Sequence, residues 1–144
     1  MAKAGDILRG KEVAQVYSIT PGATVLEALH IMAERHIGAL VVLEEERVVG
    51  ILSERDYARK VALMERSSYN TEVRDIMTHD VVTVSSTTSI EQCMAIMTER
   101  RLRHLPVVDA DRLLGMVSIG DLVKAIITHQ KSQIDQLEQY IRGA

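Results

Sequence analysis

The feature that most constrains this chain is a seven-residue stretch, Gly50–Asp56 (GILSERD), which returns 65 positions later as Gly115–Asp121 (GMVSIGD). The same offset holds without a gap from position 18 to position 63 of the first copy. An internal repeat of this length indicates one supersecondary unit that occurs twice. A chain of 144 residues provides about one domain-sized core, so we expect the two half-sized units to share it.

Each copy of the stretch runs from a glycine through two apolar residues to a serine, and an aspartate follows three positions later. This pattern predicts a strand that ends at the start of a helix. Helix starts carry backbone N–H groups without intrahelical partners and the positive end of the helix dipole, so they can hold anions. The Ser-x-x-Asp spacing is also a variant of the capping box, in which both side chains only complete the first helical turn. The candidate residues are Ser53, Asp56, Ser118 and Asp121.

The composition is that of an ordinary globular protein, with 47% hydrophobic and 26% charged residues. No apolar run approaches the roughly 18 residues of a membrane-spanning helix, and the first residues lack the apolar stretch of a signal peptide. We therefore expect a cytoplasmic protein without a membrane partner. The 17 basic and 20 acidic residues create no overall positive field, which disfavours nucleic acid as a partner.

The sequence lacks the common motifs for catalysis and metal binding. It contains no His-Glu-x-x-His, no Gly-x-Gly-x-x-Gly, no P-loop and no nucleophile with a matching base. The five histidines show no metal-ligand spacing, and the single cysteine, Cys93, lies between apolar residues of a helical pattern. We expect Cys93 to be a core residue, and we expect neither enzymatic activity nor a bound metal.

Each copy predicts the element order strand, helix, strand, strand, helix. In the first copy, Thr24 begins a helix that ends at Gly38, and the second helix begins at Asp56. Pro106 lacks an N–H group, so its strand is expected to have an open side there. The polar, non-periodic residues 66–71 are expected to link the two units. The predicted strands include one that ends at Ile19 and others that cover residues 39–43, 48–53, 81–84, 104–108 and 113–118.

Three phrases, Ile37–Val42 (IGALVV), Gly50–Asp56 and Arg103–Val108 (RHLPVV), closely resemble the corresponding phrases of tandem CBS domains. The resemblance covers nearly the whole chain. It implies an α+β fold of two β-α-β-β-α CBS units packed about a pseudo-twofold axis, each with a small sheet and two helices. It also implies two clefts, which in many members of the family bind adenosine-containing ligands. The domain boundaries that follow are residues 1–66, residues 67–129 and, for a C-terminal helical extension, residues 130–144.

The repeated stretches carry side chains that suit such a ligand. A carboxylate has two acceptor oxygens for the two hydroxyls of a ribose, and we expect this role for Asp56 and Asp121. Ser53 and Ser118 can supply a hydroxyl to ribose or phosphate. The positions expected to offer apolar side chains or backbone groups to an adenine are Ser18, Ile19, Gly38, Ala39, Leu40, Thr83, Val84, Leu105 and Pro106.

A phosphate requires positive charge, and the two copies supply it differently. The second copy has Arg103 and His104 at the start of its strand, whereas the first has Arg55 inside the repeated stretch. Guanidinium groups bind phosphate in a bidentate way. The alternative is a solvated basic helix end, because Arg and His near a helix C-terminus also favour the dipole. Lys11 is a further candidate, and the inequality of the copies predicts different ligands or one weak site.

Three functions remain open at this point. We favour a regulatory module that senses energy or redox state by binding an adenine nucleotide, with AMP as the first choice and ATP or NAD(H) next. The alternatives are an enzyme, which the missing motifs disfavour, and a ligand-free interaction or dimerisation module whose aspartates only cap helices. The sequence shows no catalytic, channel or DNA-binding domain, so the output is expected to pass through an unknown effector protein or through self-association.

The end of the chain predicts a homodimer. Apolar residues alternate there by three and four, which is the spacing of coiled-coil positions. Roughly two heptads are too few to pair alone, so we expect the helix to support an interface made elsewhere in the chain. The alternative is that the helix folds back on its own unit. The positions concerned are Ile127, Gln130, Ile134, Leu137 and Ile141.

Overall fold

The computed structural model describes residues 2–9 and 17–143 of the chain. These residues form two compact units, each of which contains one of the two repeated stretches. The first-repeat unit covers residues 15–82 and 110–113, and the second-repeat unit covers residues 1–14, 83–109 and 114–144, in both cases as far as they are described.

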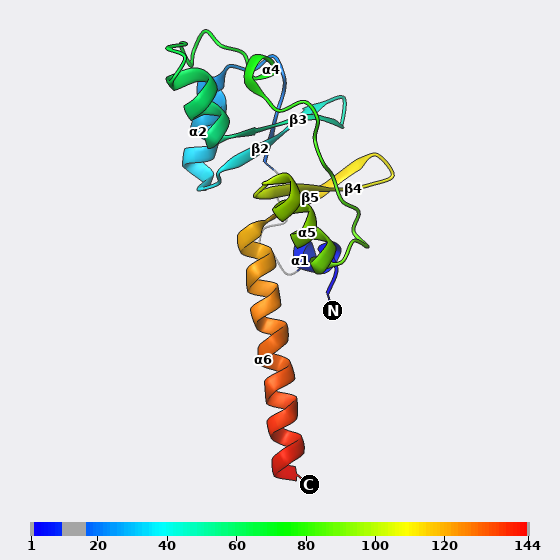
Figure 1. Ribbon diagram of the computed structural model, residues 1–144. Helices are drawn as coiled ribbons and strands as arrows, with labels where there is room; N and C mark the ends of the chain where they lie inside the picture. The colour runs from blue at the N-terminus through cyan, green and yellow to red at the C-terminus, as the bar shows by residue number, and fades with distance from the viewer. Residues whose placement is uncertain (1, 10–16, 144) are drawn as a thin grey trace. The chain divides into compact units, whose positions relative to one another are not determined.

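The first-repeat unit contains β1 (Ser18–Ile19), α2 (Val25–Arg35), β2 (Ala39–Glu44), β3 (Arg47–Ser53), α3 (Glu54–Tyr57), a π-helix (Ala58–Ala62) and α4 (Val73–Ile76) (Figure 1). Its three strands form one sheet in the order β1-β2-β3. β1 pairs in parallel with β2, and β2 pairs antiparallel with β3. This register places Ala39 opposite Ser53, at the end of the sheet where β3 leads into α3.

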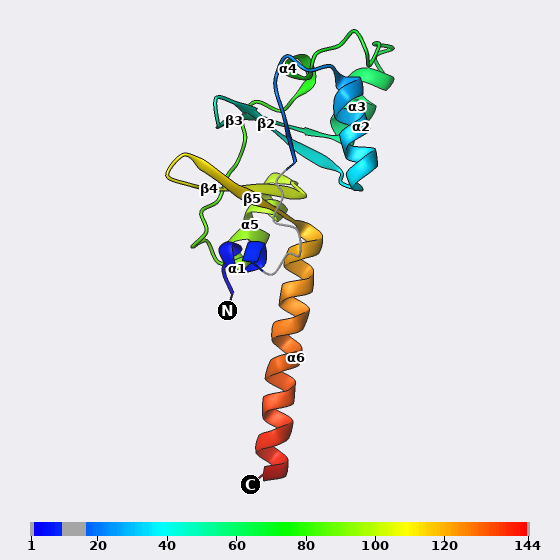
Figure 2. The same ribbon diagram turned by 180° about the vertical axis from the view of Figure 1, so that it is seen from behind.

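The second-repeat unit contains α1 (Ala4–Arg9), α5 (Ile90–Arg100), β4 (His104–Asp109), β5 (Arg112–Ser118) and α6 (Ile119–Gly143). β4 and β5 form a two-stranded sheet. α1 and α5 both contact α6, and Figures 1 and 2 show them beside its first turns. The elements of the two units confirm the predicted mixed α+β fold with small sheets and helices.

The core of the first-repeat unit explains why β2 is an uninterrupted apolar run. Leu40 and Val42 pack with the α2 residues Val25, Ala28 and Met32 in one hydrophobic cluster. Successive side chains of a strand point to opposite faces, so Ala39 and Val41 lie on the other face of β2, and both are also buried. Burial of each large side chain contributes about 1.5–3 kcal/mol, so a charged substitution in this run would destabilise the unit.

The repeat seen in the sequence extends to the caps at the helix starts. The Thr24 hydroxyl accepts a hydrogen bond from the backbone N–H of Glu27 at 3.2 Å, before α2. Ser89 accepts from the N–H of Gln92 at 3.1 Å, before α5. The Gln92 side chain returns a bond to the N–H of Ser89, which completes a capping box.

Both of these helices end at a left-handed C-cap. α2 ends at Arg35, and its C-cap is His36 with φ 55°, so the predicted stop at Gly38 is wrong. α5 ends at Arg100, and its C-cap is Arg101 with φ 56°. The backbone N–H groups of these caps donate to the carbonyls of Met32 and Met97, which also accept from the N–H groups of Ile37 and Leu102.

The segment expected to link the units contacts the start of α2. The carbonyls of Ser68 and Thr71 accept from the N–H groups of Leu26 and Val25, two of the otherwise unpaired donors at the start of α2. Thr71 is buried, and both its N–H group and its hydroxyl donate to the carbonyl of Ser67. Residues 66–71 therefore group with the first-repeat unit through backbone hydrogen bonds.

Three further expectations need correction. The strand predicted over residues 81–84 is reduced to a single parallel bridge between Val84 and Val107. The helices predicted to begin at the repeated aspartates begin two residues earlier, at Glu54 and Ile119, because Ser53 and Ser118 are the residues that cap them. The N-terminal helix α1 groups with the second-repeat unit, so the compact units and the predicted sequence boundaries divide the chain differently.

Candidate functional site

The first candidate site is the junction of β3 with α3. Ser53 has extended backbone angles, and its hydroxyl accepts from the N–H of Asp56 at 3.1 Å. Oδ2 of Asp56 accepts in return from the backbone N–H of Ser53 at 3.0 Å and from its hydroxyl at 3.1 Å. The serine and aspartate of the repeat therefore form a complete capping box, as the capping interpretation requires.

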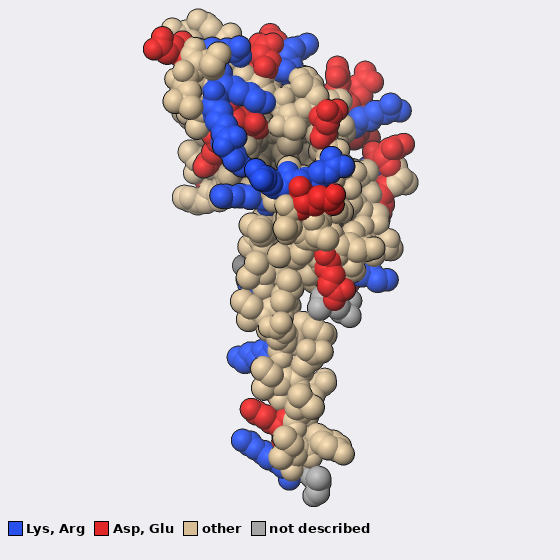
Figure 3. Space-filling model, viewed as in Figure 1, with Lys and Arg blue, Asp and Glu red and all other residues tan. Residues whose placement is uncertain are grey.

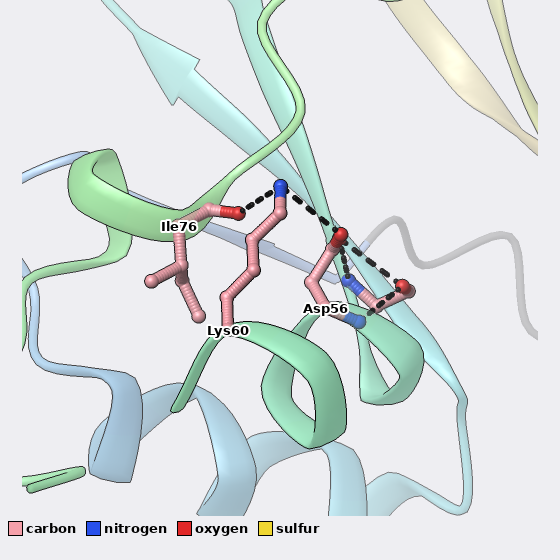
Figure 4. Close-up of polar contacts among 4 residues, drawn as sticks. Asp56, Lys60 and Ile76 are labelled. Atoms are coloured by element: carbon pink, nitrogen blue, oxygen red, sulfur yellow. Dashed lines mark hydrogen bonds and ion pairs between the residues drawn. The ribbon is translucent and has the colours of Figure 1, made fainter. Parts of the chain in front are cut away.

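Lys60 contacts the second oxygen of the same carboxylate. Its Nζ lies 3.5 Å from Oδ1 of Asp56 and donates to the carbonyl oxygen of Ile76 at 3.0 Å (Figure 4). The Asp56 side chain is only 15% exposed, so this positive charge faces a largely desolvated carboxylate. The sequence analysis missed Lys60, although a lysine four residues after an aspartate on a helix is a signal for such a pair.

The strands around the first site present small side chains and backbone groups. The N–H of Glu54 donates to the carbonyl of Gly38 at 3.0 Å, which holds the start of β2 against the start of α3. Ala39 lies opposite Ser53, whereas Ile19 and Leu40 belong to the hydrophobic core. Of the predicted adenine positions here, Ile19 and Leu40 can therefore offer only backbone groups.

The second candidate site, at the junction of β5 with α6, repeats this geometry. The backbone N–H of Ser118 donates to Oδ2 of Asp121 at 2.8 Å, and the N–H of Asp121 donates to the Ser118 hydroxyl at 3.1 Å. The N–H of Ile119 donates to the carbonyl of Arg103 at 2.9 Å, which matches the bond from Glu54 to Gly38. The two sites therefore share these backbone hydrogen bonds at equivalent positions of the repeat.

Other predicted residues of the second site lie on β4 and next to it. The carbonyl of Pro106 accepts from the N–H of Val84 at 3.0 Å, which brings these two positions together. Leu105 is fully buried, His104 is half-buried, and Arg103 and Thr83 are exposed. In the first site, Arg55 and Ser18 are exposed as well. Lys11 lies outside the described residues.

The glycine that opens each repeated stretch is required by close packing. A Cβ atom on Gly50 would collide with the side chain of Met77, and one on Gly115 would lie 2.6 Å from Cδ2 of Leu8. A strand in this position must therefore lack a side chain so that the neighbouring segment can approach it. Close packing therefore explains the glycine of each repeated stretch. The serine and the aspartate of the stretch remain the candidates for ligand binding.

The two sites differ in charge and in shape. The repeat offset places Ala125 where the first site has Lys60, so the second aspartate lacks this lysine. Asp121 instead lines a groove of about 470 Å³ between α1 and α6, together with Asp6, Lys124, Thr128 and His129. The sequence analysis did not select these groove residues, because α1 and α6 are more than 100 positions apart in the chain.

The family of the chain follows from its sequence matches. The model of the CBS domain family matches residues 5–63 and 73–128, which together are most of the chain. The chain belongs to the CBS domain family. Its two repeats are a tandem of CBS domains, and the resemblance noted in the sequence is confirmed.

The CBS domain relatives include proteins from bacteria and plants. A protein with CBS domains from Burkholderia ambifaria has a solved structure with a TM-score of 0.85 and 47% identity, and the match covers 90% of this chain and 96% of that one. The mitochondrial CBS domain-containing protein CBSX3 of Arabidopsis thaliana is 40% identical over 129 residues, 86% of this chain and 63% of its own length. A hexameric CBS-CP12 protein from bloom-forming cyanobacteria is 27% identical, with a TM-score of 0.75, and the match covers 84% of this chain and 66% of that one.

Two features are absent from residues 2–9 and 17–143. No helix in these ranges is both long and apolar enough to span a membrane. No group of three or more His, Cys, Asp or Glu side chains in the same ranges is arranged to hold a metal ion. Cys93 is buried in α5, as predicted, and burial raises the pKa of its thiol.

Proposed function

We propose that this tandem CBS protein is a regulatory module that binds an adenosine-containing nucleotide, AMP in the first place and ATP or NAD(H) next. The nucleotide sites are the stretches Ser53–Asp56 and Ser118–Asp121, and their occupancy is passed to an effector protein. The observation that carries the proposal is the duplicated junction, in which a strand ends at a helix start beside a carboxylate. A helix start attracts phosphate, and a carboxylate suits a ribose diol.

Capping and ligand binding are compatible at Asp56. A carboxylate has roughly four acceptor positions. Ser53 uses two of them on Oδ2, and Lys60 faces Oδ1 at 3.5 Å. A ribose hydroxyl would therefore share Oδ1 of Asp56 with Lys60.

The groove beside Asp121 supports a ligand at the second site. Its volume of about 470 Å³ lies within the range of small-molecule sites, roughly 300–1,000 Å³. Lys124 and His129 line it with groups that can bind phosphate when charged. Asp6 also lines it, so a ligand with its phosphate near Lys124 and its sugar near Asp121 fits best.

The decisive experiment compares Asp121→Asn with the wild type by isothermal titration calorimetry against AMP, ATP and NAD(H). Asparagine keeps the oxygen that accepts the Ser118 N–H, so the helix cap and the melting temperature should persist. It loses the charge and the paired acceptors for a diol, so affinity at that site should fall by about 1.5–3 kcal/mol. Asp56→Asn should weaken the first site in the same way and should also lose the ion pair with Lys60.

Asp109→Asn is the matched control, because Asp109 also accepts both the N–H and the hydroxyl of a serine, Ser86, but lies in neither repeated stretch. Its affinity for nucleotides should equal that of the wild type. If none of the three nucleotides binds the wild type by calorimetry or equilibrium dialysis, the nucleotide proposal is wrong. The capping boxes would then favour the second candidate, a ligand-free interaction module.

A further inference from the structure

The last fourteen described residues of α6 form an exposed extension of the helix. Every residue from Gln130 to Gly143 is exposed, although the helix continues through all of them. An isolated helix of this length is marginal in water. Figure 3 shows that charged side chains are sparse along the face of α6 that it presents. The alternative that the helix folds back on its own unit is therefore wrong for the described residues.

The exposed part of α6 carries a regular apolar face, which we call the seam. Its positions recur by three and four, as the a and d positions of a coiled coil do, with Gln130 at the one polar position. The apolar residues of the seam are Val123, Ile127, Ile134, Leu137 and Ile141, and their exposed fractions are 42%, 59%, 55%, 63% and 75% in that order. Exposure of so many large apolar side chains is unfavourable for an isolated helix in water.

The seam faces away from the groove that α1 forms with α6. The groove is lined by Asp121, Ala125, Thr128 and Ser132, which lie on one side of the helix. Ile127 lies two residues after Ala125, which is about 200° around a helix of 3.6 residues per turn. A partner on the seam would therefore leave most of the groove open, and Lys124 would be the one groove residue that also contacts the second copy.

We propose that the seam binds the seam of a second copy of this chain in an antiparallel helix pair that spans α6. In this register Ile127 packs against Leu137 of the second copy, Val123 against Ile141, and Ile134 against Gln130. Tyr140, which is 77% exposed, covers Ile126 of the second copy. The pair uses the full length of α6, because its centre lies near Lys131, in the middle of the helix.

Charge selects the antiparallel register. It places Lys124 beside Glu138 of the second copy, and the twofold symmetry of the pair makes this ion pair twice. One repulsive contact, Lys131 with Lys131 of the second copy, opposes them. A parallel pair would place Lys131 beside Ile126 and Glu138 beside Gln133, so it would have no attractive charge pair.

Charge reversal tests the register by sedimentation equilibrium in about 50 mM salt, where surface charges are weakly screened. Glu138→Lys and Lys124→Glu each turn two attractive pairs into repulsive ones, so each should raise the dimer dissociation constant about tenfold. The double variant restores opposite charges and should return to the wild-type value. The antiparallel register would be overturned if the single variants had the dimer dissociation constant of the wild type. It would also be overturned if the double variant raised that constant by the combined effect of the two single variants.

A second pair of variants tests the seam itself. Ile134→Lys places a charge in the seam and should leave a folded monomer, because Ile134 is exposed in the free chain. Gln139→Lys adds the same charge on the opposite side of the helix and should dimerise as the wild type does. The wild type should be loaded at about 100 µM, which is ample for a micromolar dimer. A monomeric wild type at that concentration, or an Ile134→Lys variant that dimerises with full affinity, would overturn the proposal.

Discussion

Serine–aspartate pairs recur in this chain and have more than one structural origin. In Ser53–Asp56 and Ser118–Asp121 the partners are three residues apart and close a helix cap. In the third pair, Ser86 reaches Asp109 across 23 positions, with its N–H at 3.0 Å and its hydroxyl at 2.5 Å from the two carboxylate oxygens. The hydroxyl bond and then the backbone bond hold the pKa of Asp109 below its usual value, and partial desolvation opposes them.

The lowered pKa of Asp109 predicts a pH-dependent contribution to stability. A carboxyl whose pKa is lower in the folded state stabilises the fold above the unfolded pKa, near pH 4, and this stabilisation is lost as the pH falls through the folded value. Ser86→Ala should therefore lower the melting temperature at pH 7, and the difference from the wild type should shrink below pH 4. Thermal melts from about pH 2, which is roughly two units below the usual pKa of an aspartate, to pH 7 would check this. A difference that stays constant with pH would contradict the role of the charge.

At the scale of elements, the helices α2 and α5 each have a C-cap residue that is poorly suited to its left-handed conformation. His36 and Arg101 occupy left-handed positions where glycine is preferred, at the same place in each repeat. The cost for a residue with a side chain is about 1–2 kcal/mol, and the entropy that glycine adds to the unfolded chain offsets part of it. These helix ends are therefore places where the fold can be made more stable.

Arg101→Gly should stabilise the protein by about 0.5–1 kcal/mol, because it removes the strain at φ 56°. Arg100→Gly is the matched control. Arg100 is the last residue of α5 and has helical angles, so glycine there should destabilise by up to about 1 kcal/mol. Urea denaturation of the two variants would check the opposite signs. Equal effects from both variants would show that the arginines act through charge and not through backbone conformation.

At the scale of the whole molecule, α6 serves two purposes. Its first turns, with Leu122 fully buried, belong to the core of the second-repeat unit, and its start carries Asp121. Its last fourteen described residues are exposed and carry most of the seam. The homodimer predicted from the sequence stays a prediction, but the seam proposed for it lies on the other side of α6 from the groove beside Asp121.

Removal of residues 130–144 should separate self-association from ligand binding. The described part of this segment is exposed, so the melting temperature of the truncated protein should change little when it is measured as a dilute monomer. Its dimer affinity should be lost, whereas its affinity for nucleotides should fall little, because Ser132 is the one groove residue that lies in the removed segment. A strong fall in melting temperature at low concentration would show that the helix end supports its own unit.

The local features of this protein are determined by its sequence alone. The repeat, the caps at Thr24, Ser89 and Ser118, and the two hairpins follow from patterns that act over three or four residues. Backbone hydrogen bonds and capping side chains at such short range do not depend on the rest of the chain, so both repeats build the same junctions. The same reasoning selects Asp56 and Asp121 but does not distinguish a capping role from a ligand role.

Only the tertiary structure decided which distant segments meet. It placed Lys60 on the carbonyl of Ile76, residues 66–71 on the start of α2, and α1 against the second repeat, where the N–H of Gly5 donates to the carbonyl of Ser86. These contacts provide hydrogen-bond partners for backbone groups, and no local sequence pattern predicts which carbonyl is used, because every backbone carbonyl has the same chemistry. The carbonyl that is used depends on the path of the chain, and that path depends on the packing of the whole core.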